Sequence, residues 1–449
     1  MDIISVLRGI GGVAFIIGIA FLFSNNKKHV NWALVAKAFG IQLIFAIFII
    51  HSVTLRSWFW PLGLLKDIID GIGTGVVALL NYTMVGAQFV FGNLAVNSGS
   101  NSLGFFFAFQ VLPTIIFVSA LTSLLYYLGI LQAVVKVMAR VMVKVLGTSG
   151  AESLSNTANI FVGQTEAPLL IRPYIGTMTN SEVLTIMVGG MATIAGGVMA
   201  SYIQMLGQSF SEAHNIPLAE GQLKFAVQLL AASTMAAPAS LAISKIIYPE
   251  MEEPVTKGTV KLEVEKNASN VIEAAATGAS DGLQLALNVG GMLLAFIALI
   301  AMFNGILGYV GDITGLNTYL QSHYHQTLSM QFLFGSVLQF VAIAIGVPLN
   351  DAFNFGSLLG TKVVLNEFVA YLDLSALLKT GAMSEKGVMM ATYALCGFAN
   401  FSSIAIQIGG ISPMAPHRKK DIASLGLRAV LGGLLSTLMT ATIAGILVG

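Results

Sequence analysis

Long apolar stretches dominate this sequence and limit most strongly what it can fold into. A run of about 20 apolar residues is long enough to cross the hydrocarbon core of a bilayer as a helix. Because lipid cannot satisfy backbone hydrogen bonds, repeated runs of this length predict an all-α membrane protein. About eight candidate crossings are found, at residues 4–24, 33–52, 103–129, 182–209, 222–247, 285–311, 387–411 and 422–448.

The composition agrees with a chain that has lipid as its main solvent. Hydrophobic residues make up 56% of the 449 positions and charged residues 10%, whereas soluble domains carry roughly 25% charged residues. The net charge of +1 gives no electrostatic basis for binding nucleic acid. The single Cys396 cannot form an intrachain disulfide. The first apolar run lacks a basic leader and a cleavage site, which predicts a retained helix rather than a signal peptide.

The distribution of lysine and arginine predicts the orientation, because these residues accumulate on the cytoplasmic side. With both termini outside, the inside receives Lys27 and Lys28, the loop 248–267 and the basic run Arg418–Lys420. It also receives segment 131–147, whose basic residues recur four apart and predict an amphipathic helix in the interface. We expect segment 61–82 to lie in the interface in the same way. Few basic residues remain outside: Arg56, Lys66, Lys224, Lys379 and Lys386.

Two segments, 152–176 and 331–371, fit no simple crossing. Each has an apolar arm, a break rich in Gly, Pro or Asn, and a second arm. Non-helical backbone is tolerated at membrane depth only when protein buries it or when it lines a wet cavity, so we expect re-entrant hairpins. Each is followed by a span with a polar interruption, "VGGMATIAGGV" (188–198) or "LCGFANFSSIAI" (395–406), and then by an uninterrupted span. The order therefore occurs twice, in inverted orientation, as in transporters that bind their substrate at the midplane.

Ionisable residues at membrane depth cost about 2.5–3.5 kcal/mol each on insertion scales and are functional candidates. The first hairpin contains Glu166, and the second contains Asp351, Lys362 and Glu367. Asp351 and Lys362 can be interpreted as a structural ion pair. Two carboxylates in matched hairpins, with amides and hydroxyls near them, instead indicate a site for a neutral polar solute, since a carboxylate can accept two hydrogen bonds from a diol.

A coupling cation would need hard oxygen ligands, which carbonyls of unwound helix can supply. Asn159 lies one helical turn before Gly163, so its amide oxygen could join carbonyls near Val162. Thr193 and Ile194 add a hydroxyl and further carbonyls in the interrupted span. An Asn or Thr in a membrane helix can equally make a helix–helix hydrogen bond, so both interpretations stay open for these residues.

Three long motifs resemble the concentrative nucleoside transporters: "NIFVGQTEAPLLIRP" (159–173), "GVP" with "NEFVAY" (346–348 and 366–371) and "CGFANFSSIAI" (396–406). The resemblance runs through nearly the whole chain and implies a homotrimer, with a scaffold and a mobile transport domain in each protomer. The expected parts are 1–130, scaffold helices with an interfacial segment; 131–150, a cytoplasmic interfacial helix; 151–247, the first transport repeat; 248–330, a cytoplasmic loop, a scaffold helix and an outer connector; and 331–449, the second, inverted repeat.

The resemblance also implies roles for individual residues. The nucleobase would be contacted by Gln164, Thr165, Glu166, Val198 and Phe398, and the ribose by Glu367, Asn400 and Ser403. Sodium would be bound by Asn159, Val162, Thr193 and Ile194. Sodium-coupled bacterial members often have Ser where this chain has Thr193, and the hydroxyl is retained. Proton-coupled members depart from "GQTEAP", which this chain keeps, so sodium is favoured.

The sequence therefore predicts a sodium-coupled symporter that imports nucleosides such as uridine or adenosine across a bacterial inner membrane by alternating access. No cofactor besides the coupling ion is expected, and no enzymatic activity. A proton-coupled symporter, a passive channel and an intramembrane hydrolase with two carboxylates as acid and base are the alternatives. The hydrolase lacks a metal motif or a nucleophile elbow. Purine or pyrimidine preference and the ratio of ions to substrate stay open.

Overall fold

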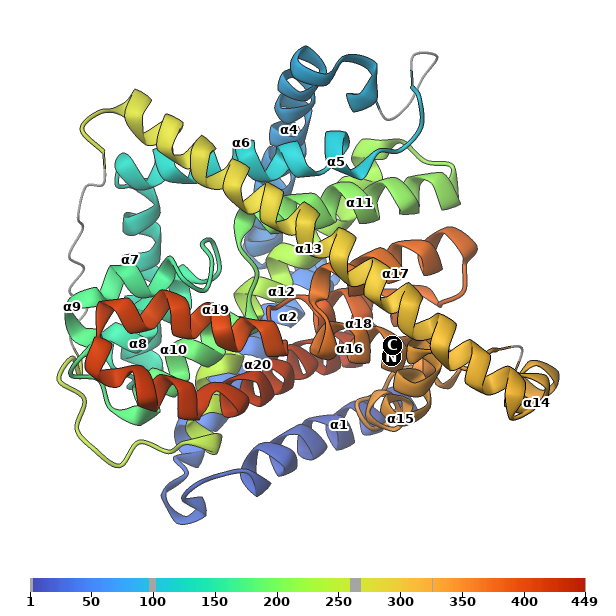
Figure 1. Ribbon diagram of the computed structural model, residues 1–449. Helices are drawn as coiled ribbons and strands as arrows, with labels where there is room; N and C mark the ends of the chain where they lie inside the picture. The colour runs from blue at the N-terminus through green and yellow to red at the C-terminus, as the bar shows by residue number, and fades with distance from the viewer. Residues whose placement is uncertain (1–2, 97–101, 259–267, 325, 449) are drawn as a thin grey trace.

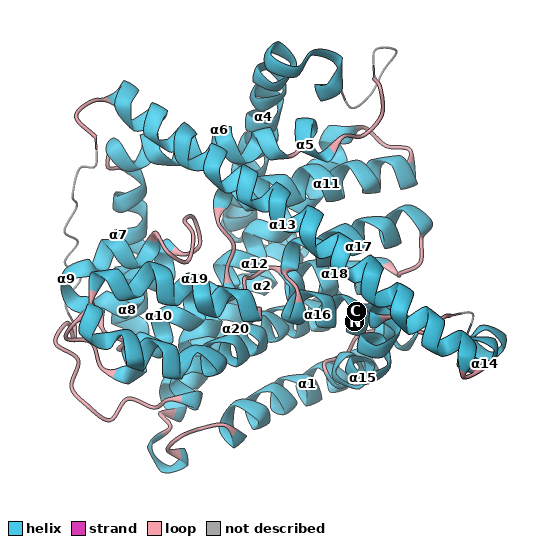
Figure 2. Cartoon of the chain, in the orientation of Figure 1, coloured by secondary structure: helices cyan, strands magenta, loops and turns pink. Residues whose placement is uncertain are grey.

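The computed structural model describes residues 3–96, 102–258, 268–324 and 326–448 (Figures 1 and 2). Within these ranges the chain forms helices and no strand, with one isolated bridge between Ser149 and Lys257. The first helices are α1 (Ile3–Leu22), α2 (Trp32–Ile50), α3 (Ser52–Trp58), α4 (Leu64–Phe91), α5 (Phe107–Gln110), α6 (Leu112–Tyr127) and α7 (Ile130–Leu146).

The chain continues through the helices that carry the predicted site. These are α8 (Gly150–Ala158), α9 (Arg172–Ile175), α10 (Asn180–Ala192), α11 (Gly196–His214), α12 (Leu218–Ile247), α13 (Val271–Ile313) and α14 (Leu316–Tyr324). The last are α15 (Met330–Ala344), α16 (Ala352–Val364), α17 (Glu367–Thr380), α18 (Glu385–Leu395), α19 (Phe401–Ile411) and α20 (Lys419–Val448). Short 3₁₀ turns are η1 (Lys27–His29), η2 (Trp60–Gly63), η3 (Gly92–Ala95), η4 (Ala167–Ile171), η5 (Leu349–Asp351), η6 (Ser412–Met414) and η7 (Pro416–Arg418).

Eight helical segments in the described ranges are long and apolar enough to cross a membrane, so the predicted class, an all-α membrane protein, is confirmed. All the predicted crossings except 387–411 coincide with such a segment. That stretch is divided between α18 and α19, which have 11 residues each. The remaining candidate is Leu64–Ala95, which overlaps segment 61–82, where the sequence predicts an interfacial helix.

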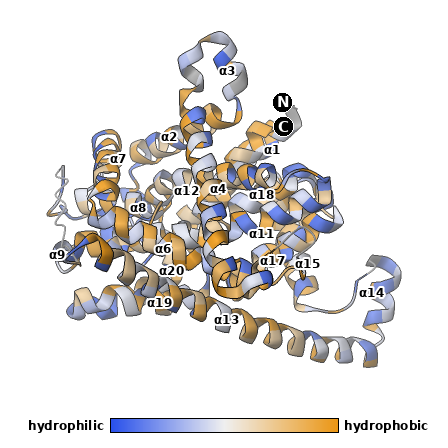
Figure 3. Cartoon of the chain, turned by 90° about the horizontal axis from the view of Figure 1, so that it is seen from above, coloured by the Kyte–Doolittle hydropathy of each residue, from blue (hydrophilic) through white to orange (hydrophobic). Residues whose placement is uncertain are grey.

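The candidate crossings fall into a buried group and an outer group. In their most apolar windows, 89% of the residues are buried in the α10–α11 segment, 83% in the segment that ends with α20 and 78% in α12. The corresponding share is only 22% in α1 and α13, and 28% in the segments of α4 and α6. Hydrophobic residues lie along these outer helices, as the colours of α1 and α13 in Figure 3 show. Three central crossings thus form a protein-enclosed core, while the outer helices present apolar surface to lipid or to another chain.

Helix α13 is the longest element and runs diagonally across one face of the molecule (Figure 1). Its 43 residues span about 65 Å, which is roughly twice the thickness of the hydrocarbon core. Near its start it packs on α6, and α15 packs against α16. Helix α1 lies along α20, where Gly9 contacts Ile446, so the beginning of α1 and the end of α20 are close together (Figure 1).

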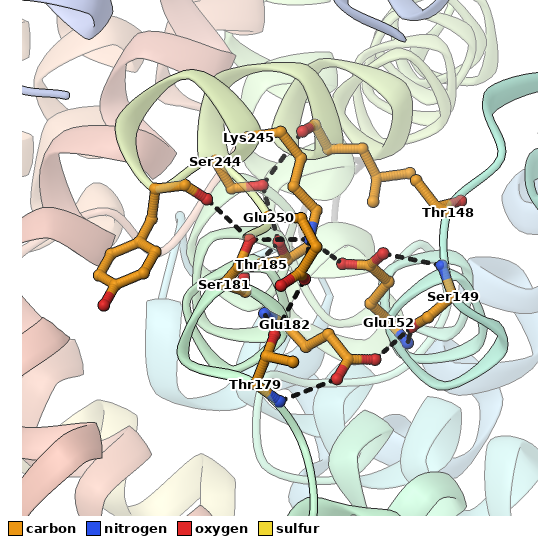
Figure 4. Close-up of polar contacts among 12 residues, drawn as sticks. Thr148, Ser149, Glu152, Thr179, Ser181, Glu182, Thr185, Ser244, Lys245 and Glu250 are labelled. Carbon is orange, nitrogen blue, oxygen red and sulfur yellow. Dashed lines mark hydrogen bonds and ion pairs between the residues drawn. The ribbon is translucent and has the colours of Figure 1, made fainter. Parts of the chain in front are cut away.

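A buried polar cluster fastens the starts of α8 and α10 to the end of α12 (Figure 4). Ser149 caps α8 and its hydroxyl donates a hydrogen bond to Glu182, in the first turn of α10. Lys245 of α12 forms ion pairs with Glu152 at 2.8 Å and with Glu250 at 3.2 Å. Because these bonds hold the helices at their outer ends, the opposite ends of α8 and α10 are positioned in the centre of the molecule.

Candidate functional site

The first predicted site segment forms a tight turn between α8 and η4. Asn159 is the C-cap of α8, and the N–H groups of Glu166 and Ala167 both donate to the carbonyl of Gly163, at 3.2 and 3.1 Å. A Cβ atom on residue 163 would overlap with Oε2 of Glu166. Only glycine therefore allows the Glu166 carboxylate to fold back over the turn.

The second predicted site segment begins α17. Asn366 caps this helix by accepting a hydrogen bond from the N–H of Val369 at 2.9 Å. Glu367 follows, and only 5% of its surface is exposed. Its carboxylate accepts hydrogen bonds from the Tyr202 hydroxyl at 3.1 Å and from the Asn400 amide at 2.9 Å. The carboxylate is therefore held between α11 and the segment that precedes α19.

Asn400 connects the start of α17 at Asn366 and Glu367, called here the second tip, to the break between α18 and α19. Its Oδ1 accepts a hydrogen bond from the N–H of Ser403 at 2.9 Å, so Asn400 is the N-cap of α19. The same oxygen accepts a hydrogen bond from the hydroxyl of Ser402 at 2.7 Å. In the same break, a Cβ atom on Gly397 would lie 2.7 Å from the carbonyl oxygen of Met191, near the end of α10. The break after α18 and the break after α10 are thus in direct contact.

Gln164 of the first turn is held by α19. Its Nε2 donates to the Ser403 hydroxyl at 3.3 Å, and its Oε1 accepts from Nε2 of Gln407 at 3.1 Å. Gln407 also donates to the carbonyl of Met187 at 2.9 Å. The sequence analysis does not identify Gln407, or the Tyr202 that holds Glu367. Each lies within a helix, and the sequence of the helix does not indicate which of its faces meets the site.

A cavity of about 160 Å³ lies between the first turn, the second tip and α13. One wall is apolar and comes from Leu285, Val289, Met292 and Leu293 of α13. Opposite it, the structure brings together all the residues that the sequence predicts for nucleobase and ribose: Gln164, Thr165, Glu166, Val198, Glu367, Phe398, Asn400 and Ser403. An apolar pocket with a few convergent polar groups is the usual form of a small-molecule site.

A larger cavity, of about 270 Å³, adjoins the first one. Both are lined by Gly163, Glu166, Ala195 and Leu285. The larger cavity continues along hydroxyl-bearing residues of α6 and past Asp281 of α13. Glu166 contributes to the lining of both cavities. The two cavities therefore meet at the first turn, beside α13.

The residues predicted to bind a cation lie where the first turn meets the break after α10. The N–H of Gly196 donates to the carbonyl of Phe161 at 3.1 Å, which joins the two segments. Asn159 is fully buried, and neither atom of its amide has a hydrogen-bond partner. The Thr193 hydroxyl donates to the carbonyl of Gly189 at 2.9 Å. In the described part of the chain, no donor reaches the carbonyl oxygens of residues 190–194. Such unpaired oxygens fit a hard cation.

The interpretation of Asp351 and Lys362 as an ion pair is wrong. Asp351 accepts hydrogen bonds from the N–H of Ser384, at 3.0 Å, and from its hydroxyl, at the start of α18. The Lys362 ammonium donates to the carbonyl of Ala394 at 2.7 Å and to the hydroxyl of Thr437 at 3.1 Å. The two residues are separated by nearly the whole of α16, about 16 Å along a helix axis, which keeps their side chains apart.

Family models match three successive parts of the chain. Residues 11–94 match the model described as the Na+ dependent nucleoside transporter N-terminus, and residues 228–445 match its C-terminus. Between them, residues 108–209 match the model described as nucleoside recognition. The nucleoside permease NupC of Helicobacter pylori is 41% identical, over 100% of this chain and 99% of the relative. The chain belongs to the concentrative nucleoside transporter family.

Other relatives and solved structures agree with this membership. An uncharacterized transporter of Haemophilus influenzae is 45% identical, over 99% of this chain and 98% of the relative. Mouse sodium/nucleoside cotransporter 1 is 39% identical over 96% of this chain, which covers 62% of that protein. The structure of CNTnw in an inward-facing substrate-bound state has 42% identity and a TM-score of 0.84, and covers 99% of each chain.

A CNTnw variant in an outward-facing state has 41% identity and a TM-score of 0.86, over 100% of this chain and 99% of the variant. Because the family consists of transporters, the chain is a multi-pass membrane transporter of nucleosides and not an enzyme. The alternative of an intramembrane hydrolase is thereby excluded.

Proposed function

We propose that the chain is a symporter that imports nucleosides across a bacterial inner membrane and is driven by a sodium gradient. The observation that carries this proposal is the cavity in which polar groups from the first and second turns converge. The family description, with its Na+ dependence, supports the choice of ion.

In this proposal the nucleobase lies against Val198 and Phe398 and is bound by Gln164, Thr165 and Glu166. These side chains offer amide, hydroxyl and carboxylate groups to the polar edge of a base. The ribose is bound by Glu367, Asn400 and Ser403. Each carboxylate oxygen of Glu367 accepts one protein hydrogen bond, so its remaining lone pairs are available to the 2′- and 3′-hydroxyl groups.

Sodium is proposed to bind the Asn159 amide oxygen, the hydroxyl of Thr193 and carbonyl oxygens at Val162 and Ile194. The ion would then fix the turn that carries Gln164 to Glu166, because this turn begins at Asn159. A nucleoside would bind more tightly once the turn is fixed, and by linkage the nucleoside would raise the affinity for sodium by the same factor. This coupling allows the ion gradient to drive uptake.

Transport requires the cavity to open to each side in turn. We propose that segments 152–176 and 331–371 are re-entrant hairpins, and that the repeats 151–247 and 331–449 move together past the outer helices. The separation of buried and outer crossings supports such a division. The CNTnw matches include inward-facing, outward-facing and intermediate states, which favours alternating access by an elevator-like movement.

Assembly and orientation are part of the same proposal. The exposed apolar residues of α4 and α13 would be covered by lipid and by the other protomers of a homotrimer. The packing of Gly9 against Ile446 favours both termini on one side of the membrane, and the distribution of lysine and arginine places that side outside.

A competition experiment tests the proposed substrate and ion together. Binding of radiolabelled uridine to the purified protein in nanodiscs would be measured in sodium chloride and in choline chloride, with uridine, adenosine, uracil and ribose as competitors. We expect nucleosides to compete well only in sodium, and the free base and free sugar to compete weakly. Equal binding in choline would remove the sodium coupling, and a requirement for low pH instead would favour a proton-coupled symporter.

A further inference from the structure

Lys362 is a charged residue that the proposed substrate and sodium sites do not use. It lies near the end of α16 and is completely buried. None of the ion pairs found in the described ranges includes it. Its ammonium donates instead to the Ala394 carbonyl and the Thr437 hydroxyl. An ammonium in such a place is costly unless it has a specific partner or function.

The Ala394 carbonyl belongs to the end of α18, where the helix stops before the break. The last four carbonyls of a helix lack partners within the helix itself. In α18 each one has a donor: Thr392 accepts from the Tyr371 hydroxyl at 2.8 Å, Tyr393 from the N–H of Cys396 at 3.2 Å, Ala394 from Lys362 at 2.7 Å and Leu395 from the N–H of Gly397 at 2.8 Å. The last four carbonyls of α18 are therefore all paired with protein donors.

The first break is built differently at the corresponding end of α10. There the Gly189 carbonyl is bonded by the Thr193 hydroxyl, but the carbonyls of residues 190–194 receive no donor within the described chain. The buried Asn159 amide is also without a partner. The two breaks touch where Gly397 meets Met191, yet one has unpaired oxygens and the other has a lysine ammonium.

Electrostatics connects Lys362 to the second tip as well. Glu367 lies five positions further along the chain, at the start of α17, which packs against α16, and both side chains are buried. The direct partners of Glu367, Tyr202 and Asn400, are neutral donors. A buried carboxylate is stabilised by a nearby positive charge, and Lys362 supplies that charge from within the protein.

We infer that the Lys362 ammonium is a built-in cation, which supplies positive charge to the second break and to Glu367. The coupling sodium supplies positive charge to the first break in the same way. This inference rests on the proposed function. It makes Lys362 a positioning residue, which holds the ribose-binding tip ready without an ion. Sodium then controls only the tip that binds the nucleobase.

A double-mutant cycle tests whether Lys362 acts through the charge of Glu367. The variants are Lys362→Met, Glu367→Gln and the double variant, and the readouts are uridine affinity at saturating sodium and thermal unfolding of the full chain in detergent. We expect Lys362→Met to weaken uridine binding about tenfold or more, which corresponds to a usual coupling energy between residues of one polar network. In the Glu367→Gln background the same change should have an effect of about threefold or less, and the double variant should unfold at a higher temperature than the two single effects predict.

Thr437→Val is the matched control, because it removes the side-chain acceptor of Lys362 and keeps both charges and the Ala394 carbonyl. Its effect should be additive with that of Glu367→Gln. Equal effects of Lys362→Met in the two backgrounds, in both readouts, would overturn the inference and leave Lys362 a structural residue. If the native chain binds no nucleoside, the proposed function fails, while the thermal cycle still tests the coupling between Lys362 and Glu367.

Discussion

Replacement of Glu367 by Gln gives the sharpest prediction for the ribose side of the site. The change keeps the shape of the side chain but removes its charge and turns one acceptor oxygen into a donor. In the native protein, the Tyr202 hydroxyl and the Asn400 amide donate hydrogen bonds to the Glu367 carboxylate at 3.1 and 2.9 Å. In the variant, the new N–H₂ group would face one of these two donors. At least one hydrogen bond to a charged group is lost between the site and the ribose. Such a bond contributes about 1.5–3 kcal/mol, so uridine affinity should fall about 10- to 150-fold.

The assay compares two ligands as well as two proteins. Uridine and 2′,3′-dideoxyuridine would be titrated by calorimetry at saturating sodium, against the native chain and the Glu367→Gln variant. The variant should lose affinity for uridine but hardly for the dideoxy compound, which lacks the hydroxyl groups that Glu367 is proposed to bind. Tyr202→Phe is the control, because it removes one neighbour of the carboxylate and keeps the charge. We expect it to weaken uridine about fivefold.

An equal loss of affinity for both ligands would refute this reasoning. Glu367 would then act on the fold of the second tip rather than on the ribose. An unchanged uridine affinity in Glu367→Gln would remove the residue from the site altogether.

Three further predictions address the rest of the structure. Asn159→Ala should raise the sodium concentration that half-saturates uridine binding at least about tenfold, and an unchanged sodium titration would place the ion elsewhere. Gln407→Leu removes the donor that holds Oε1 of Gln164; it should weaken uridine about two- to tenfold, with 2′,3′-dideoxyuridine affected equally because the contact lies on the base side. Lys245→Met leaves the buried Glu152 without its ion-pair partner, which should destabilise the fold by about 3–5 kcal/mol; an unchanged unfolding temperature in detergent would contradict this.

The sequence was sufficient to pick out the polar residues that lie on the first turn and at the start of α17. Gln164, Glu166 and Glu367 are conspicuous because polar residues are costly at membrane depth, and their place beside Gly163 or Asn366 indicates a break in the helix. The structure brings them to one cavity with Asn400 and the other predicted binding residues. Their roles remain predictions until a ligand is measured.

The partners of these residues could not be predicted in the same way. Tyr202 and Gln407 lie in continuous helical runs, and their contacts depend on how α11 and α19 pack against the opposite turn. The supposed pair of Asp351 and Lys362 failed for a related reason: opposite charges in one segment indicate no contact when the helix between them is long. The division of 387–411 into α18 and α19 falls within the polar interruption at 395–406 that the sequence shows.

Sodium-driven accumulation is the central claim, and uptake into proteoliposomes tests it most directly. Purified protein would be reconstituted into vesicles without an internal substrate, and radiolabelled uridine would be added with sodium outside, with sodium on both sides, or with choline. An inward sodium gradient should raise internal uridine above the external concentration, and the excess should disappear when the gradient is collapsed. Uridine that only equilibrates, or that accumulates equally well in choline, would contradict the account.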